Sequence, residues 1–189
     1  MSKMADFFDR FASEWANERL DEERVLPLLR RLNIKEGGHV LDIGCGCGII
    51  TPYLQKISKA KVIAIDASPR MIEEARKKGL EDCLFLNADF FEMDGGFDYI
   101  VCYNAYPHFV DTNRFKEKAF SLLTDGGKLY VLHSLGRDKL NAHHQGMDKD
   151  LCRDLLPVKE EARQYKDRFN IIDDFENENS YGFILQKNR

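Results

Sequence analysis

The nine residues V-L-D-I-G-C-G-C-G, Val40–Gly48, decide the fold class of this chain. An apolar run leads directly into a turn that carries Gly44, Gly46 and Gly48, and a helical pattern follows. Glycine adopts positive φ angles and has no Cβ atom, so the backbone N–H groups of such a turn can approach a ligand closely. The following helix N-terminus favours a negative charge, and the carboxylate of Asp42 suits a cationic or hydroxyl-bearing group. This stretch therefore predicts a site for a zwitterion such as an amino acid, in a nucleotide-linked enzyme.

The composition is that of one globular domain. The chain has 189 residues, of which 43% are apolar and 32% charged, enough for a full core. Its formal net charge is −4 and no basic stretch is denser than Arg76–Lys78, so we expect no nucleic-acid partner. No apolar run approaches the length of a membrane span, which predicts no membrane partner. The five cysteines are an odd number without disulfide spacing, and this favours a reducing cytoplasm.

Apolar strand patterns alternate with amphipathic helical patterns from residue 39 onward. The expected strands are His39–Ile43, Lys61–Ile65, Cys83–Asn87, Phe97–Tyr103 and Lys128–His133. The expected helices are Ile49–Ile57, Pro69–Lys78 and Thr112–Leu123, and Ser68 followed by Pro69 is typical of a helix start. Such alternation predicts a parallel sheet covered by helices on both faces.

The two ends of the chain differ from this pattern. Aromatic residues recur at helical spacing over Met4–Trp15, which predicts a helix that packs on the core or covers a ligand. A second helix is expected over Glu22–Leu32, with a kink at Pro27. At the other end, Phe169–Asp173 and Tyr181–Gln186 flank a short polar loop at residues 174–180. Two strands joined by so short a loop predict an antiparallel pair.

Five motifs in this order resemble those of the class I S-adenosylmethionine-dependent methyltransferases that act on small molecules. The turn D-I-G-C-G-C-G resembles the first motif of that family, and V-I-A-I-D-A-S-P-R-M-I-E-E-A-R, residues 62–76, resembles the second. F-L-N-A-D-F-F, residues 85–91, and F-D-Y-I-V-C-Y-N-A-Y-P-H-F, residues 97–109, are similar to the third and fourth. L-L-T-D-G-G-K-L-Y-V, residues 122–131, is similar to the glycine turn before strand five. The resemblance extends from about Phe7 to Lys187.

The resemblance implies an α/β fold, a three-layer Rossmann-like sandwich. Its seven-stranded, mostly parallel sheet would have the order 3-2-1-4-5-7-6, with strand seven antiparallel. The chain, residues 1–189, would then be a single methyltransferase domain. Residues 1–34 would form an N-terminal helical lid, and residues 134–165 would form the substrate-specific region.

The resemblance also implies S-adenosyl-L-methionine as cofactor, with S-adenosyl-L-homocysteine as product. The expected cofactor-binding residues are Asp42, Gly44, Cys45, Gly46, Asp66, Ala67, Met71, Asp89, Phe90 and Asn104. Asp66 would accept hydrogen bonds from both ribose hydroxyls, because a carboxylate offers two acceptor oxygens to a vicinal diol. A dinucleotide oxidoreductase also places an acid beyond its glycines. The present spacing, D-x-G-x-G-x-G, differs from its G-x-G-x-x-G fingerprint and disfavours it.

The residues expected beside the transferring methyl group are Asn104, Tyr106, His108 and His133, with no metal ligand among them. A histidine there would serve as base or orienter for the acceptor. Three interpretations remain open for the histidines. In the first, the histidines are structural: His133 ends a strand with a satisfied hydrogen bond, and His143–His144 is an exposed helical pair. In the second, one or more of the histidines act on the acceptor as base or orienter. In the third, they bind a metal ion or an acceptor that is itself a metal or metalloid.

The segment 134–165 is polar and charged, which favours a polar or anionic small-molecule acceptor. We expect a monomer or homodimer without a macromolecular partner. Two alternative functions are a non-catalytic S-adenosylmethionine-binding or regulatory protein, and a histidine-assisted, metal-dependent methyltransferase. One fold supports many chemistries, so the acceptor itself cannot be derived from these motifs.

Overall fold

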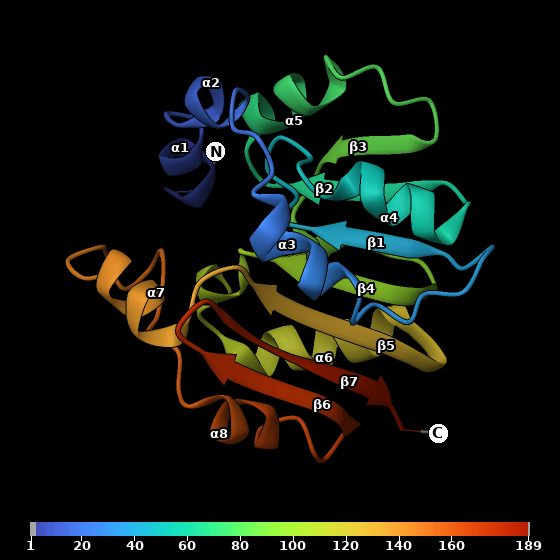
Figure 1. The fold of residues 1–189 in the computed structure, drawn as a ribbon, viewed down its shortest axis with the longest axis vertical. Coiled ribbons are helices and arrows are strands. Elements are labelled where there is room, and N and C mark those ends of the chain that lie inside the picture. The colour runs from blue at the N-terminus through green and yellow to red at the C-terminus, as the bar shows by residue number, and fades with distance from the viewer. Residues whose placement is uncertain (1–2, 189) are drawn as a thin grey trace.

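The computed structural model describes residues 3–188, and its centre is one seven-stranded sheet (Figure 1). The strands are β1 (Val40–Ile43), β2 (Val62–Asp66), β3 (Cys83–Asn87), β4 (Phe97–Tyr103), β5 (Leu123–His133), β6 (Phe169–Asn177) and β7 (Ser180–Lys187). Their order is β3-β2-β1-β4-β5-β7-β6. The first five strands are parallel, and β7 pairs antiparallel with both β5 and β6. The expected topology is confirmed.

Helices cover both faces of this sheet. They are α1 (Lys3–Phe8), α2 (Ala12–Trp15), α3 (Glu22–Leu29), α4 (Thr51–Ser58), α5 (Pro69–Arg76), α6 (Thr112–Leu122), α7 (Arg137–His143) and α8 (Val158–Arg163). Two short 3₁₀ helices, η1 (Phe90–Glu92) and η2 (Tyr106–His108), follow β3 and β4. No helix within residues 3–188 is both long and apolar enough to cross a membrane.

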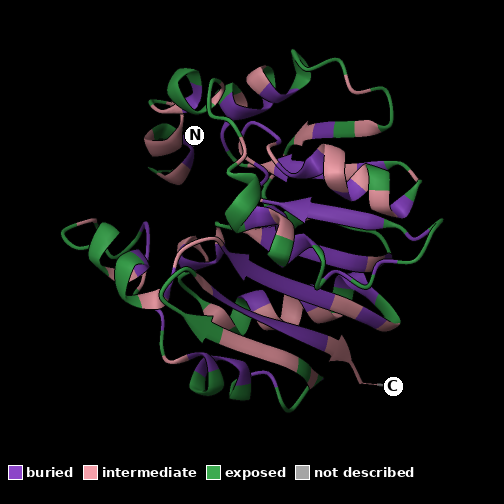
Figure 2. Cartoon of the chain, viewed as in Figure 1, coloured by how far each residue is buried: buried purple, intermediate pink, exposed green. Residues whose placement is uncertain are grey.

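The core consists of two main layers of side chains, one on each face of the sheet. On one face, α3 and α4 pack on β1 through residues such as Leu28 and Leu54. On the other face, α6 and α8 pack on β4, β5 and β7 through residues such as Phe115 and Ala162. Because β1 and β4 are covered on both sides, both are apolar and buried along almost their whole length (Figure 2).

The carboxyl ends of the parallel strands point to one side of the molecule, where α1, α2 and α7 lie (Figure 1). Capping residues determine where several of the helices begin. Ser68 accepts a hydrogen bond from Met71 N and precedes Pro69, so α5 begins directly after β2. Asp21 and Asp111 cap α3 and α6 in the same manner. The functional residues expected from sequence therefore gather at one edge of the sheet.

The single helix expected over Met4–Trp15 is instead two helices, α1 and α2, separated at residues 9–11. At this break, the carboxylate of Asp9 contacts the start of α5. It accepts a hydrogen bond from the Ser68 hydroxyl and another from Arg70 N, at 3.3 Å. The second expected helix is shorter than predicted. It ends at Leu29 rather than Leu32, two residues after Pro27.

The polar loop expected at residues 174–180 is largely absent from the structure, and this prediction was wrong. β6 and β7 continue toward each other until Asn177 pairs with Ser180. Asn177 Oδ1 accepts a hydrogen bond of 2.9 Å from Asn179 N, which closes the tight turn. The polar residues of this segment belong to β6, an edge strand that is only partly buried, so their polarity reflects the exposure of that strand rather than a loop.

The close packing of β7 on its neighbours gives a prediction at Gly182. A Cβ atom there would lie 2.4 Å from the Val131 carbonyl oxygen and 2.7 Å from a ring carbon of Phe175. We expect Gly182→Ala to lower the free energy of unfolding by about 1–3 kcal/mol, a typical cost of overpacking. The control is Gly96→Ala, whose Cβ would meet Thr124 at 3.7 Å, an ordinary contact. Equal urea midpoints for the two variants would contradict this packing.

Candidate active site

The glycine turn after β1 has the backbone that its sequence predicts. Gly44, Gly46 and Gly48 have φ angles of 62°, 53° and 72°, in the left-handed region. A Cβ atom on Gly44 would lie 2.6 Å from Cβ of Ala105, and one on Gly48 would meet the Phe85 ring. The turn therefore depends on glycine for its conformation and, at two positions, for close packing.

Asp66, at the end of β2, is bonded to this turn. Its Oδ2 accepts a hydrogen bond of 2.9 Å from Gly46 N, and its Oδ1 accepts one of 2.8 Å from Ser68 N. Burial raises the pKa of Asp66, and the two backbone N–H groups oppose that shift because they stabilise the carboxylate. One side chain thus joins the loops that follow β1 and β2.

A cavity of about 350 Å³ opens beside Asp66 at the carboxyl ends of β1, β2, β3 and β4. Eight of the ten residues expected to bind the cofactor line it. They are Gly44, Gly46, Asp66, Ala67, Met71, Asp89, Phe90 and Asn104. Asp89 also caps η1 by accepting a hydrogen bond from Phe91 N, which places the buried ring of Phe90 at the cavity wall.

Asp42 and Cys45, the other two expected residues, lie behind the turn and do not line this cavity. Both are buried. Asp42 accepts a hydrogen bond of 2.7 Å from the Thr51 hydroxyl, so its carboxylate holds the start of α4. Burial raises the pKa of Asp42 to about 7. The structure therefore does not bring Asp42 to a ligand in this cavity.

Two of the four residues expected beside the acceptor also line the cavity, Asn104 and His108. Asn104 follows β4 with a φ angle of 52°, a conformation that asparagine tolerates better than most residues. Its amide group exchanges two hydrogen bonds of 3.0 Å with Ser134, one with Oγ and one with the backbone N. This pairing ties the end of β4 to the end of β5.

His108 has its protonation pattern fixed by the backbone. Its Nδ1 lies 2.8 Å from the Leu151 carbonyl oxygen, which can only accept, so Nδ1 carries the proton. In the neutral ring, Nε2 then keeps its lone pair. The pKa of His108 is lowered to about 4, mainly by burial and to a smaller extent by His144 and His143, while the hydrogen bond to Leu151 opposes the shift. Near neutral pH this side chain is an uncharged hydrogen-bond acceptor.

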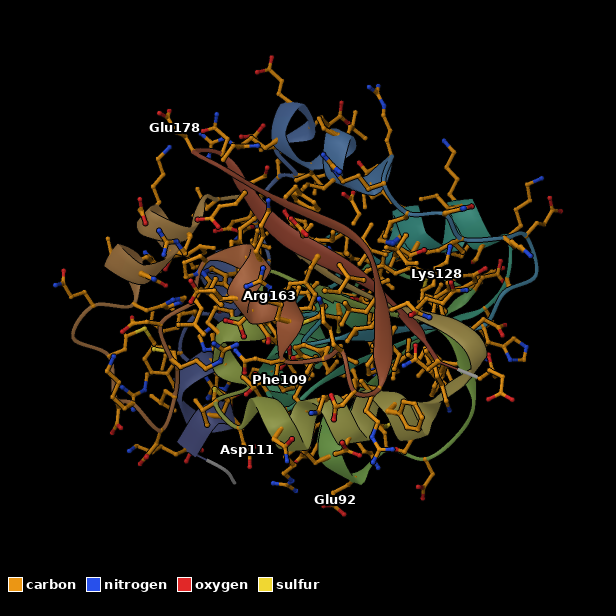
Figure 3. All side chains as sticks on the ribbon, turned by 90° about the horizontal axis from the view of Figure 1, so that it is seen from below. Glu92, Phe109, Asp111, Lys128, Arg163 and Glu178 are labelled. Carbon is orange, nitrogen blue, oxygen red and sulfur yellow. The ribbon has the colours of Figure 1, made fainter. Side chains whose placement is uncertain are left out.

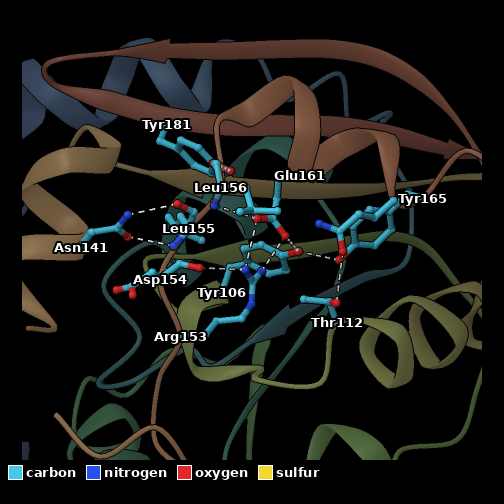
Figure 4. A network of polar contacts seen from close by, with 11 residues as sticks. Tyr106, Thr112, Asn141, Arg153, Asp154, Leu155, Leu156, Glu161, Tyr165 and Tyr181 are labelled. Carbon is cyan, nitrogen blue, oxygen red and sulfur yellow. Dashed lines mark hydrogen bonds and ion pairs between the residues drawn. The ribbon is translucent and has the colours of Figure 1, made fainter.

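Tyr106 and His133, the other two expected residues, are fully buried and do not line the cavity. The Tyr106 hydroxyl lies 2.7 Å from the Tyr165 hydroxyl and donates to Glu161 at 2.8 Å (Figure 4). Glu161 in turn pairs with Arg153 at 2.7 Å. Tyr106 therefore belongs to a buried polar network that braces the segment before α8.

The ring nitrogens of His133 have no hydrogen-bond partner among the described residues, so the satisfied bond considered for it is not found. The two residues of the pair His143–His144, both expected to be exposed, differ in their burial. His143 is exposed, whereas His144 is buried with its ring 5.2 Å from that of His108. Within residues 3–188, no three or more histidine, cysteine, aspartate or glutamate side chains are placed to hold a metal ion.

Sequence reasoning missed several cavity residues on the loop between β4 and α6. Phe109, Val110 and Asp111 on this loop, together with Arg114 in the first turn of α6, line the cavity beside the N-terminal segment. Figure 3 shows Phe109 and Asp111 on this loop. Asp111 caps α6 by accepting a hydrogen bond from Arg114 N, and the Arg114 guanidinium stacks on the Phe91 ring at 4.0 Å. The closeness of this loop to residues 4–15 depends on tertiary packing, which no local pattern reports.

Comparison with known proteins shows that the sequence matches a methyltransferase family. The profile of the family described as "Methyltransferase domain" matches residues 34–179. A ubiquinone biosynthesis O-methyltransferase of Xylella fastidiosa (strain 9a5c) is 34% identical over 141 residues, which cover 67% of this chain and 56% of that protein. The corresponding protein of Xanthomonas oryzae is 31% identical over 102 residues, which cover 50% and 42%. The chain spans about half the length of these curated relatives.

Solved structures share the fold at lower identity. The N-methyltransferase NodS of Bradyrhizobium japonicum, in complex with S-adenosyl-L-homocysteine, superimposes with a TM-score of 0.74 at 16% identity and full coverage of both chains. Phosphoethanolamine N-methyltransferase 2 of Haemonchus contortus, in complex with S-adenosyl-L-methionine, superimposes with a TM-score of 0.77 at 16% identity. The superposition covers all of this chain and 61% of that protein. At these identities the likeness concerns the fold.

The raised pKa of Asp42 predicts a pH dependence of stability. The folded chain keeps a proton on Asp42 up to about pH 7, whereas the unfolded chain releases it near pH 3.8, so this contribution to stability is lost as pH rises toward 7. The amide that Asp42→Asn introduces does not titrate. We therefore expect the free energy of unfolding of this variant, relative to the wild type, to rise by on the order of 3 kcal/mol from pH 5 to pH 8. Urea titrations at both pH values measure this, and a constant difference would contradict it.

Proposed function

Because this chain belongs to the methyltransferase domain family, we propose that it transfers a methyl group from S-adenosylmethionine to a small polar acceptor. The observation that carries the proposal is the cavity bounded by the glycine turn on one side and by Asp66 on the other. Its wall combines the backbone of the glycine turn, the half-buried carboxylate of Asp66 and apolar side chains. A nucleoside joined to an amino acid presents the complementary groups.

The cavity residues divide naturally between the parts of this cofactor. Asp66 would accept hydrogen bonds from the ribose hydroxyls, and the apolar side chains of Met71 and Phe90 would enclose the adenine, with Asp89 beside its amino group. Gly44 and Gly46 leave the backbone open to the methionine part. These roles are supported by the shared cavity wall and by the absence of side chains at the two glycines. Asp42 and Cys45 would act indirectly, by supporting the turn.

The cofactor supplies an activated methyl group, and the protein supplies alignment of the acceptor. Alignment alone can contribute about 7–11 kcal/mol in the best cases. An acceptor that must lose a proton also needs a base, which typically adds about 10²–10⁴-fold in rate. We assign that role to His108, and the assignment is supported by its place in the cavity wall and by the free lone pair on Nε2. Asn104 would position the acceptor or the cofactor at the same edge.

The curated relatives are named for O-methylation in ubiquinone biosynthesis, and this chain matches about half of their length. Their names favour an oxygen acceptor, and we extend to this chain only the transfer of a methyl group to a small molecule. Residues 134–165 would select that molecule. They contribute Asp150 to the cavity wall and Leu151 as the partner of His108.

Within the single domain of residues 1–189, we further propose that α1 and α2, from the expected lid segment 1–34, act as a lid, whereas α3 belongs to the core on β1. Met4, Phe8 and Trp15 line the cavity from α1 and α2. Three contacts hold this part in place. Lys3 forms ion pairs with Asp148 and Asp150, the Phe8 ring packs edge-on against His108 at 4.8 Å, and Asp9 caps α5 through Ser68 and Arg70.

The assignment of Asp66 predicts the effect of its removal. In Asp66→Ala, two charge-assisted hydrogen bonds to the ribose would be lost, each worth about 1.5–3 kcal/mol. We expect the Kd for S-adenosylhomocysteine to rise by about 10²-fold or more in calorimetry. Asp94→Ala, at an exposed position outside the cavity, is the control. Unchanged affinity in a folded Asp66→Ala protein would refute the assignment.

The lid proposal predicts the reactivity of Cys47. Its thiol is buried beneath α2, 3.5 Å from the Ala12 carbonyl oxygen and 3.4 Å from the Met71 sulfur. Alkylation of Cys47 therefore requires the lid to open. We expect Asp9→Ala to accelerate iodoacetamide labelling of Cys47 and S-adenosylhomocysteine to slow it, as followed by peptide mass spectrometry.

Asp6→Ala, an exposed change on α1, serves as the matched control for the labelling rate. The half-buried Cys83, far from the lid on β3, reports general unfolding in the same samples. A labelling rate at Cys47 that neither Asp9→Ala nor the ligand alters would contradict the lid.

A further inference from the structure

Residues 151–156 lie between α7 and α8 and form neither a helix nor a strand. We call them the strap. Three of its side chains are buried, those of Leu151, Cys152 and Leu155. Buried backbone outside regular structure has to find its hydrogen-bond partners in other elements. The strap finds them in α7, α8, β7 and η2, so its position depends on all four (Figure 4).

The strap is bonded to η2 at two points. The backbone N of Arg153 donates a hydrogen bond of 3.0 Å to the Pro107 carbonyl oxygen. The Leu151 carbonyl oxygen lies 2.8 Å from Nδ1 of His108. These two bonds hold the strap against consecutive residues of η2, the second of which lines the cavity.

The carboxylate of Glu161, on α8, joins the strap to η2 (Figure 4). One of its oxygens accepts a hydrogen bond of 2.7 Å from Arg153 Nη2, and the other accepts from Arg153 Nη1 and from Leu156 N, both at 3.1 Å. The first oxygen also accepts from the hydroxyl of Tyr106, the first residue of η2, at 2.8 Å. A carboxylate has about four lone-pair sites, so these four hydrogen bonds use its full accepting capacity.

The ion pair of Arg153 and Glu161 is almost free of solvent contact. The Glu161 side chain is fully buried, that of Arg153 is 17% exposed, and the guanidinium lies over the Tyr106 ring at 4.7 Å. A buried ion pair adds little net stability, because the loss of hydration of both charges offsets their attraction. Two parallel hydrogen bonds between a guanidinium and a carboxylate, however, fix the orientation of both groups. This pair therefore holds geometry more than it adds stability, and the geometry is that of the strap on η2.

The position of the strap determines which ring nitrogen of His108 carries a proton. A neutral imidazole has one proton on either nitrogen, and the hydrogen bond that one nitrogen makes sets the choice. The Leu151 carbonyl can only accept, so it keeps the proton on Nδ1 and leaves Nε2 as an acceptor. Among the described residues the ring makes no other hydrogen bond, and it packs edge-on against the rings of Phe8 and His144. The strap is therefore the contact that selects this tautomer.

We propose, resting on the methyltransferase function above, that Glu161 and Arg153 are positioning residues for His108. They hold the strap where the Leu151 carbonyl meets Nδ1, and the proton fixed on Nδ1 leaves the lone pair of Nε2 for the acceptor. During transfer Nε2 receives the proton that the acceptor loses, Nδ1 keeps its own, and water takes up the extra proton afterwards. Neither Glu161 nor Arg153 lines the cavity, so both act through the strap.

The test reads the ring of His108 directly and needs no acceptor. NMR of the full chain with isotope-labelled histidine, saturated with S-adenosylhomocysteine near neutral pH, distinguishes a protonated ring nitrogen from an unprotonated one. The wild type should show the proton of His108 on Nδ1. The variant His108→Asn identifies these signals by their absence.

The variant Glu161→Gln removes the charge that holds Arg153 and turns one acceptor oxygen into a donor, in a side chain of the same size. We expect the strap to loosen and the proton of His108 to distribute between Nδ1 and Nε2. Glu160→Gln, exposed at the neighbouring position on α8, is the matched control and should keep the wild-type signals. A folded Glu161→Gln protein with the proton still confined to Nδ1 would overturn the proposal.

This measurement separates positioning from a contribution to stability alone. Breaking a purely structural pair lowers the unfolding midpoint and leaves the ring of the folded molecules unchanged. Arg153→Lys keeps the positive charge but cannot form the paired hydrogen bonds, so we expect it to give both tautomers as well. It repeats the test at a partly exposed position, which decides the matter where Glu161→Gln does not fold.

Calorimetry with S-adenosylhomocysteine on the same samples distinguishes this proposal from the function on which it rests. We expect normal binding in the wild type and in both variants, because neither side chain lines the cavity. Absence of binding to the wild type would refute the methyltransferase proposal itself. Normal binding, together with the Nδ1 tautomer of His108 in Glu161→Gln and Arg153→Lys alike, would refute the positioning role alone.

Discussion

The site depends on the hydrogen bond from Gly46 N to the carboxylate of Asp66. This contact joins the loop after β1 to the loop after β2, and it requires the left-handed backbone that only glycine adopts without strain. Asp66 also accepts from Ser68 N, next to the point where Asp9 docks the N-terminal helices. The glycine turn, the cavity wall and the lid are therefore coupled through one half-buried carboxylate.

The site retains polar groups that a core selected for stability alone would replace. Asp42 is buried with its pKa raised to about 7, and His133 is buried without a partner among the described residues. Each lowers stability, since an apolar group of similar shape would avoid the loss of hydration. Arg153 and Glu161 differ from them because they pair with each other and with Tyr106 (Figure 4). The Arg153–Glu161 pair braces the segment before α8, Asp42 holds the start of α4 through Thr51, and the ring nitrogens of His133 have no partner among the described residues.

Sequence reasoning recovered the elements whose signals are local. The glycines at 44, 46 and 48 predicted a left-handed turn, and Ser68 with Pro69 predicted the start of α5. The strand order came from resemblance to a family, and only the terminal antiparallel pair from the pattern itself. The burial of Tyr106 and His133 could not be predicted, because it depends on where α7 and α8 pack over β5 and β7. The approach of His144 to His108 has the same tertiary origin.

The measurement that tests the central claim most directly is a calorimetric titration of the wild-type chain with S-adenosylmethionine, alongside a nicotinamide dinucleotide. The account predicts saturable binding of the sulfur nucleotide and none of the dinucleotide, because the glycine turn and Asp66 bound a cavity of about 350 Å³ that suits a single nucleoside. Preference for the dinucleotide, or no binding of S-adenosylmethionine, would contradict the assignment of the cavity and every role derived from it.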